Sequence, residues 1–133
     1  MQTNTYLFFN GNCKAAFEHY ERHLGGTIDM MITADEAPAD MPAQPGFENN
    51  IMHARMQLAD NVLMGSDAPP NRYNKPQGFD VNITVDTPEE AERIFNALAE
   101  NGEVHMPLEK TFWAERFGAL VDQFGIPWMV NCE

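Results

Sequence analysis

TYLFFNGNCKAAFEHYERHLGG at residues 5–26 and DVNITVDTPEEAERIFNALAENG at residues 80–102 follow one plan. Each stretch begins with a short apolar-rich run typical of a strand, continues through a polar helix start, and stops at glycine after about three helical turns. A fixed offset of 75 residues lays Thr5 on Asp80. The sequence therefore predicts an internal duplication.

Each copy is followed by further strand-like runs, which end in VLMGSD at 62–67 and PWMVNC at 127–132. The repeating unit is thus predicted as strand, helix, strand, strand, strand. A cavity built between two such copies has lining positions that can be read from strand alternation.

The chain of 133 residues has the length of one domain. We predict a single domain over 1–133, with module one at about 1–67, a linker at 68–78 and module two at about 79–133. Residues 34–50, rich in proline and acidic residues, are predicted to form a long irregular loop that acts as a lid or is simply mobile.

Two helices carry start and stop signals. Asn12 is the expected N-cap of the first helix, and Thr87-Pro88-Glu89-Glu90 predicts a capping box at the second. The expected buried positions are Ala16, Phe17, Tyr20 and Leu24 in the first helix, and Ala91, Ile94, Phe95 and Leu98 in the second.

Strand alternation is clearest at residues 80–85, where Val81, Ile83 and Val85 alternate with polar residues. The same alternation of apolar and polar residues recurs at residues 53–58. Because Ala59-Asp60-Asn61 predicts a turn, the strand through Leu63 is expected to pair with the preceding one as a hairpin.

Charge and composition exclude several classes of partner. The chain has 20 acidic and 8 basic residues, a net charge of −12, and this argues against nucleic acid. No apolar run is long enough to cross a membrane and no signal peptide is recognisable, so we expect a cytoplasmic protein. Cys13 and Cys132 lack metal-type spacing and are expected to be free thiols.

A concave sheet face follows from the strand parity. If Asp80 points into the cavity, an amphipathic set of side chains accompanies it, which suits a small organic molecule with an acidic or polar head. The alternative is a half-solvated sheet face without a ligand. The positions expected on this face are Thr5, Leu7, Phe9, His53, Arg55, Gln57, Val62, Met64, Ser66, Asp80, Asn82, Thr84, Arg116, Gly118, Leu120, Met129 and Asn131.

His53, Trp113 and His105 are further candidates for function. His53 is a candidate general base or lone metal ligand, or a histidine hydrogen-bonded to Asp80 or Gln57 for structural reasons. Trp113, next to Phe112, forms an aromatic wall at the pocket mouth or belongs to the core. His105 could form a fortuitous metal site with nearby Glu103 and Glu109.

The runs His19-Tyr20, Leu24-Gly25 and above all TFWAERFGALVDQFGIPWMVN at 111–131 resemble the PhnB-like branch of the vicinal oxygen chelate superfamily. This superfamily includes glyoxalase I, bleomycin-resistance proteins and extradiol dioxygenases. The resemblance implies a glyoxalase-like α+β fold, in which two βαβββ modules form a curved, incompletely closed eight-stranded mixed sheet with the helices outside. It also implies a homodimer.

In metal-using members of the superfamily, the four ligand positions correspond here to Thr5, Met64, Asp80 and Met129. Only Asp80 is an ordinary ligand for a hard divalent ion, and thioethers suit soft metals. We therefore expect no metal at the usual positions and no cofactor, although a divalent ion elsewhere stays an open alternative. The chain also lacks the glycine-rich turn and parallel βαβ series that would hold adenosylmethionine.

Two functions of different class are consistent with the resemblance. The first is an enzyme with lyase, isomerase or oxygenase chemistry on a small polar or anionic molecule, with His53 and Asp80 as acid/base or ligand residues. The second is a protein that binds or sequesters a small molecule, as bleomycin-resistance proteins do. The expected ligand-binding residues are Arg55, Gln57, Met64, Asn82, Trp113, Arg116 and Met129.

Overall fold

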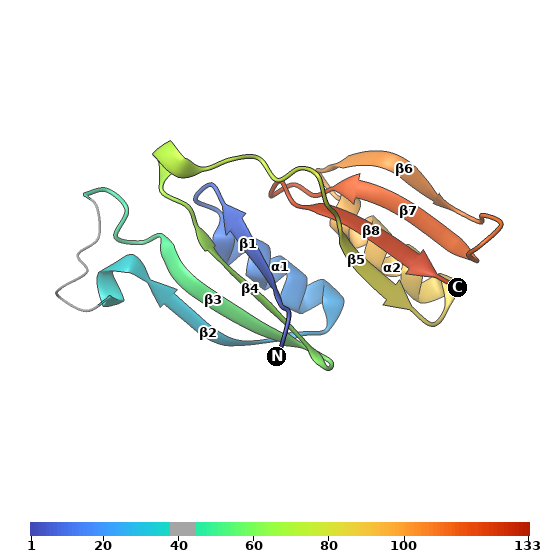
Figure 1. Ribbon diagram of the computed structural model, residues 1–133, viewed down its shortest axis with the longest axis horizontal. Coiled ribbons are helices and arrows are strands. Elements are labelled where there is room, and N and C mark those ends of the chain that lie inside the picture. Colours follow the sequence, from blue (N-terminus) through green and yellow to red (C-terminus); the bar gives the residue numbers. More distant parts are fainter. Residues whose placement is uncertain (38–44) are drawn as a thin grey trace. The chain divides into compact units, whose positions relative to one another are not determined.

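The structure is a computed structural model that describes residues 1–37 and 45–133 (Figure 1). The chain divides into two compact units, Met1–Asn74 and Lys75–Glu133. Residues 38–44 of the predicted 34–50 loop lie outside the described residues. Among those described, no helix is both long and apolar enough to cross a membrane.

Each unit follows the predicted order of strand, helix and three strands. The first contains β1 (Thr5–Phe9), α1 (Cys13–Leu24), β2 (Thr27–Thr33), β3 (Ile51–Leu58) and β4 (Asn61–Asp67), with short 3₁₀ turns at Ala34–Glu36 and Pro70–Arg72. The second contains β5 (Val81–Val85), α2 (Pro88–Ala99), β6 (Glu103–Glu109), β7 (Arg116–Val121) and β8 (Pro127–Cys132). The predicted α+β class and its two βαβββ modules are confirmed.

The eight strands are divided between two mixed four-stranded sheets, ordered β1-β4-β3-β2 and β5-β8-β7-β6. In each sheet the first strand of the module pairs in parallel with the last, and the other pairs are antiparallel. The predicted hairpin is confirmed as β3–β4, in which Leu58 faces Asn61 across the turn.

Each helix packs against one face of its own sheet (Figure 1). In each helix the apolar residues recur every three or four positions, so they lie on one side of the helix, which is buried. The buried helix residues are Cys13, Ala16, Phe17 and Tyr20 in α1, and Ala91, Ile94, Phe95 and Leu98 in α2. This confirms the predicted stripe of α2, and that of α1 except for the half-buried Leu24.

The predicted alignment of the first strands is wrong by one residue. Tyr6 pairs with Met64 in the first unit as Asn82 pairs with Met129 in the second, an offset of 82 − 6 = 76. The helices still begin 88 − 13 = 75 residues apart. The link between the first strand and the helix is therefore one residue shorter in the second unit.

This shift reverses the predicted direction of the β1 side chains, because neighbouring strand residues point to opposite faces. Leu7 and Phe9 are 2% and 0% exposed and belong to the core beneath α1. Phe9 contacts Phe17 of the helix, with ring centroids 6.0 Å apart. Tyr6 and Phe8 therefore lie on the opposite face, where Leu7 and Phe9 were expected.

The start of α1 is held by Asp67. Asn12 occupies the expected N-cap position, but its side chain makes no capping hydrogen bond. Asp67 instead accepts hydrogen bonds from the backbone N–H groups of Cys13 at 2.9 Å and Ile51 at 2.8 Å. Burial and, second, the negative charge of Asp67 raise the pKa of the Cys13 thiol well above its ordinary value. The thiol is therefore a poor nucleophile.

The start of α2 follows the sequence signal more closely. Thr87 Oγ1 accepts a hydrogen bond from the backbone N–H of Glu90 at 3.2 Å, as an N-cap does. The Glu90 carboxylate accepts hydrogen bonds from Arg93 rather than closing the predicted capping box. The N-cap is confirmed, whereas the reciprocal half of the box is replaced by this ion pair.

Candidate functional site

Each sheet has one face covered by its helix, and we call the opposite face the helix-free face. In the second unit, Gly118 and Leu120 of β7 are buried with Trp128 and Val130 of β8, their partners across the ladder. The alternate residues must point to the other side. The helix-free face of the second sheet therefore carries Asn82, Thr84, Phe117, Ala119, Val121, Met129 and Asn131.

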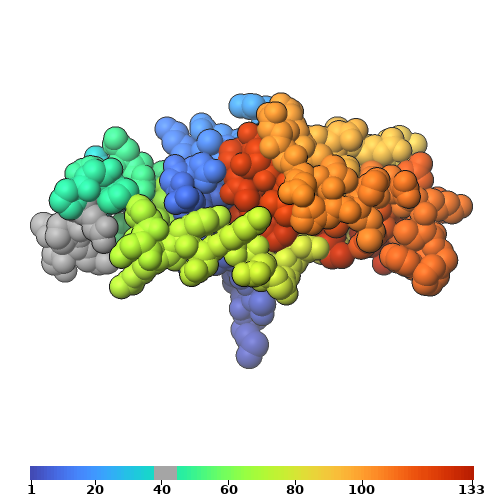
Figure 2. Space-filling view, turned by 90° about the horizontal axis from the view of Figure 1, so that it is seen from above, coloured from blue at the N-terminus to red at the C-terminus, as the bar shows by residue number. Residues whose placement is uncertain are grey.

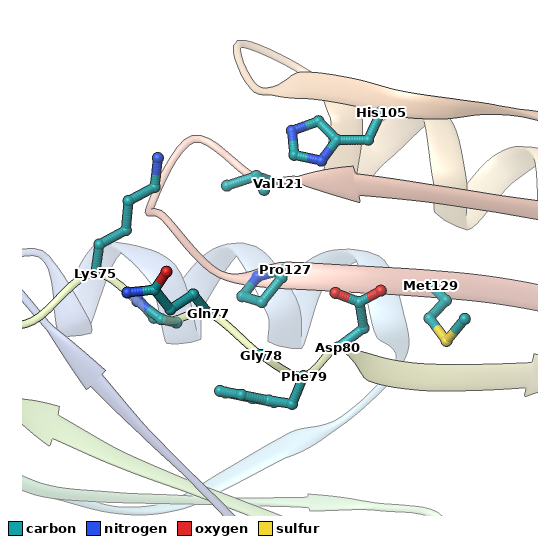
Figure 3. A pocket seen from close by; sticks show the side chains of 10 residues that line it. Lys75, Gln77, Gly78, Phe79, Asp80, His105, Val121, Pro127 and Met129 are labelled. Carbon is teal, nitrogen blue, oxygen red and sulfur yellow. The ribbon is translucent and has the colours of Figure 1, made fainter.

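A hollow of about 590 Å³ lies where β5 and β8 begin (Figure 3). The segment that leads into β5 forms one side of it, and this segment is mostly exposed at the molecular surface (Figure 2). The hollow brings together Asp80 and Met129, two of the predicted site residues. Its lining residues are Lys75, Pro76, Gln77, Gly78, Phe79, Asp80, His105, Val121, Pro127 and Met129.

The lining of the hollow contains charged groups of both signs and apolar side chains. Lys75 supplies an ammonium group and Asp80 a carboxylate, while Phe79, Pro127 and Met129 supply apolar surface. Such a mixture can orient a polar head group and still bury a carbon skeleton.

His105 lines the hollow, although strand alternation did not predict it there. The β6–β7 ladder shifts register between Val104 and Met106, and His105 lies at this irregularity. Its Nε2 lies 3.7 Å from Glu103 Oε1. Within 1–37 and 45–133, no three His, Cys, Asp or Glu side chains are grouped as a metal site would require. The alternative metal site with Glu103 and Glu109 is thus not formed.

Arg116 does not lie on the predicted face. It pairs with the buried Cys132, which places it on the same side of β7 as Gly118 and Leu120. Its Nε lies 3.3 Å from the Glu92 carboxylate of α2, and its Nη1 donates a hydrogen bond to the Glu115 carbonyl. The predicted parity of β7 was wrong, so Arg116, Gly118 and Leu120 all face the helix side.

Trp113 lies in an ordered turn between β6 and β7. Thr111 Oγ1 accepts hydrogen bonds from the backbone N–H groups of Trp113 and Ala114. Trp113 is 52% exposed and Phe112 is 95% exposed. The Trp113 ring meets Phe117 edge-on at a centroid distance of 5.5 Å. Phe112 and Trp113 thus form an exposed aromatic surface and are not part of the core.

The first unit places His53, Arg55 and Met64 on its own helix-free face. The predicted partners of His53 were Asp80 or Gln57, but Tyr6 Oη lies 3.2 Å from His53 Nδ1, with the rings stacked at 5.7 Å. The wrong parity of β1 hid this partner in the sequence.

The other two polar residues predicted on β3 have local partners. Gln57 donates hydrogen bonds to the carbonyl groups of Ala59 and Asn61 and so stabilises the hairpin turn. Arg55 lies 3.9 Å from Asp29. Gln57 therefore has a structural role at the β3–β4 turn, while Arg55 is part of an exposed ion pair.

The four positions that correspond to superfamily metal ligands do not fit a divalent ion. Thr5 shares the core-facing side of β1 with Leu7, whereas Met64 lies on the other face. The remaining donors are the Asp80 carboxylate and the Met129 thioether, a poor set for a hard cation.

Comparison with known proteins identifies the family. The family described as 3-demethylubiquinone-9 3-methyltransferase matches residues 1–131. The chain belongs to this family. Protein YjdN of Escherichia coli K12, a relative, is 37% identical over 141 residues and covers 98% of the chain and 95% of its own length.

Solved structures agree with this family. Protein PA1353 from Pseudomonas aeruginosa is 46% identical, with a TM-score of 0.92 over 100% of this chain and 98% of its own. A putative 3-demethylubiquinone-9 3-methyltransferase, PhnB protein, from Bacillus cereus is 25% identical, with a TM-score of 0.85 over 100% of both chains.

Similarity of fold extends further than similarity of sequence. The fosfomycin resistance protein FosX from Mesorhizobium loti and a possible glyoxalase from Bacillus cereus share the fold at TM-scores of 0.65 and 0.60, with identities of 7% and 18%. The family match and the Bacillus cereus PhnB protein confirm the predicted PhnB-like resemblance, and the fosfomycin-resistance and glyoxalase structures share the predicted fold.

Proposed function

We propose that the protein binds a small polar or anionic organic molecule on the helix-free face of its second sheet. The observation that carries this proposal is the hollow at the start of β5 and β8. Its volume of about 590 Å³ lies within the range of ordinary ligand pockets, roughly 300–1,000 Å³.

The lining indicates what part of a ligand would contact each residue. Lys75 and His105 offer N–H donors to an acidic group, and Asp80 offers an acceptor to a hydroxyl or amine. Met129 and Phe79 would cover the apolar part. Because the chain carries a net charge of −12, Lys75 is important as a local cation that offsets long-range repulsion of an anion.

Binding without catalysis is the function that this geometry supports best. The superfamily metal positions do not fit an ion, and binding or sequestration needs no catalytic group. Acid/base roles for Asp80 in the second unit and for His53 in the first are proposals for the enzymatic alternative. For His53, the hydrogen bond between Tyr6 Oη and Nδ1 would leave Nε2 as the ring nitrogen available to a ligand.

We further propose the homodimer that the resemblance implies and the cytoplasmic location expected from the sequence. The hollow depends on neither, because it is built from residues of one unit.

A thermal-shift and calorimetric screen tests the binding proposal. The probes are benzoate and other small carboxylates, adenosylmethionine because of the family's name, and divalent ions. We expect a carboxylate to raise the melting temperature, corresponding to about 2.7 kcal/mol at a hundred times its Kd. A stoichiometric ion that stabilises the protein, and loses this effect in His53→Ala, would favour the enzyme instead.

A pair of lysine variants locates the site. Lys75→Ala removes the cation of the hollow and is expected to weaken carboxylate binding about tenfold, or about 1.4 kcal/mol. Lys110→Ala, an exposed lysine of the same unit outside the hollow, is the matched control and should bind as the wild type does. Equal losses in both variants, or no stabilising carboxylate for the wild type, would refute the proposal.

A further inference from the structure

Two histidines lie one helical turn apart on α1. His19 and His23 are separated by four positions, a spacing that brings side chains together on one side of a helix. Both are half-buried. Their ring centroids are 4.4 Å apart, and the ring planes are tilted by 56°. Because the Cβ atoms of such a pair are typically about 5–6 Å apart, the two rings lean towards each other.

The separation of the rings matches two imidazoles that bind one metal ion. A metal ion about 2.0–2.1 Å from a ring nitrogen lies about 3.2 Å from the centroid of that ring. Two rings at a right angle around the ion then have centroids about 4.5 Å apart, and two rings at the tetrahedral angle have centroids about 5.2 Å apart. The observed 4.4 Å is therefore closer to the right angle.

The ligand type and this angle indicate which ions the pair would bind. Imidazole nitrogen suits copper, nickel and zinc, and square-planar or tetragonal nitrogen coordination is typical of Cu²⁺ and Ni²⁺. Zinc sites in proteins are mostly tetrahedral, and Mg²⁺ and Ca²⁺ take oxygen ligands. The net charge of −12 attracts every cation to the chain but does not distinguish among them. Cu²⁺ and Ni²⁺ therefore fit the pair best.

Two protein ligands leave the rest of the coordination of the ion to water. Within residues 1–37 and 45–133, no third His, Cys, Asp or Glu completes a group with the two histidines. The pair thus differs from a closed structural site, in which side chains supply all four ligands. Each imidazole has two ring nitrogens, so one can bind an ion while the other keeps a hydrogen bond to a neighbouring group.

We propose that His19 and His23 bind a Cu²⁺ or Ni²⁺ ion across one turn of α1. The ion would link two successive turns of the helix and, because it binds the folded helix better than the unfolded chain, would stabilise the protein. Both histidines belong to the first unit, whereas the hollow is built from the second. The ion site therefore does not depend on the proposed function.

Calorimetric titration of the full chain with NiCl₂ and CuCl₂, without chelator or thiol, tests the ion site. We expect a stoichiometric ion that raises the melting temperature, with Cu²⁺ bound more tightly than Ni²⁺. His19→Ala and His23→Ala should each weaken binding at least about tenfold. His53→Ala and His105→Ala remove histidines of β3 and β6 and are the matched controls, which should bind as the wild type does.

A double variant tests whether the spacing forms the site. Ala15 is an exposed residue of α1, four positions before His19. In Ala15→His/His23→Ala, a histidine pair with the same spacing lies one turn earlier, so the Ni²⁺ binding lost in His23→Ala should return. The same protein shows that the titration can detect a two-histidine site.

Three results would overturn the ion site. They are no saturable ion binding by the wild type, binding that survives in both His19→Ala and His23→Ala, and an equal loss in His53→Ala or His105→Ala. Circular dichroism checks that each variant keeps its helices. Where an alanine variant does not fold, the glutamine variant, which keeps a polar side chain of similar length, takes its place. Carboxylate binding is measured separately, and its failure would refute only the proposed function.

Discussion

Replacing Asp122 by alanine is expected to lower the free energy of unfolding by about 3–5 kcal/mol. Asp122 is 4% exposed and lies in the turn between β7 and β8. Oδ1 accepts hydrogen bonds from the backbone N–H groups of Phe124 and Ile126, both at 2.9 Å. Oδ2 accepts one from Trp128 Nε1 at 2.8 Å. Alanine would remove the acceptor that these three donors share, and the Ile126 N–H and Trp128 Nε1 hydrogen bonds that it accepts are buried.

Two further variants separate the buried hydrogen bonds from the loss of a charge. Asp122→Asn keeps one acceptor oxygen but turns an amide N–H₂ towards a donor, so we expect an intermediate loss. Glu115→Ala removes an exposed carboxylate of the same unit and should change stability by less than about 0.5 kcal/mol. Urea unfolding followed by tryptophan fluorescence measures all three, and a loss below about 1 kcal/mol for Asp122→Ala would contradict this account.

Gly118→Val is expected to cost about 3 kcal/mol, at the upper end of the usual range for overpacking. A Cβ atom built at Gly118 would lie 2.8 Å from Phe95 Cε2 and 2.9 Å from the backbone Cα of Leu108. The Phe95 ring is buried and has little room to move. Leu108 is contacted through its backbone, which cannot turn aside as a side chain can. Gly118 therefore provides the space in which α2 packs against β7.

The neighbouring residue is the matched control for this substitution. Ala119 lies on the helix-free face and is half-buried. Because valine is favoured in strands, Ala119→Val should change the unfolding free energy by less than about 1 kcal/mol. Equal losses at both positions would show that α2 does not require a glycine at residue 118.

The sequence predicted those elements whose signals are local. The Thr87 cap and the buried stripe of α2 were predicted correctly, because both depend on residues within a few positions of each other. The β3–β4 hairpin was recognised from its turn residues. The alternation of β5 was equally clear, since Val81, Ile83 and Val85 are all less exposed than Asn82 and Thr84.

The wrongly placed side chains lie where a shift of one residue moves a strand's side chains to the opposite face of the sheet. The shorter link after β5 moved Tyr6, rather than Leu7, onto the helix-free face. The register shift in β6 lies at His105. The apolar runs of β7 do not reveal which side faces the helix, so Arg116 was misplaced. Repeat matching alone does not detect such one-residue changes.

Residues joined by tertiary hydrogen bonds were also missed. Asp67 binds backbone N–H groups of Cys13 and Ile51, which only the folded chain brings to it. Asp122 binds two N–H groups of its own turn together with the indole N–H of Trp128 on β8. The sequence marks them as ordinary polar residues near turns. The candidate site was therefore predicted in part: Asp80, Asn82 and Met129 were correctly assigned to one face of the second sheet.

Chemical-shift mapping with benzoate is the most direct test of ligand binding on the helix-free face. In ¹⁵N-resolved spectra of the full chain, we expect the largest saturable changes at the amides of Gln77, Asp80, His105 and Met129, with little change at Asn96 on α2. Changes centred on α2 or on the first unit, or no saturable change at any concentration, would contradict the central claim.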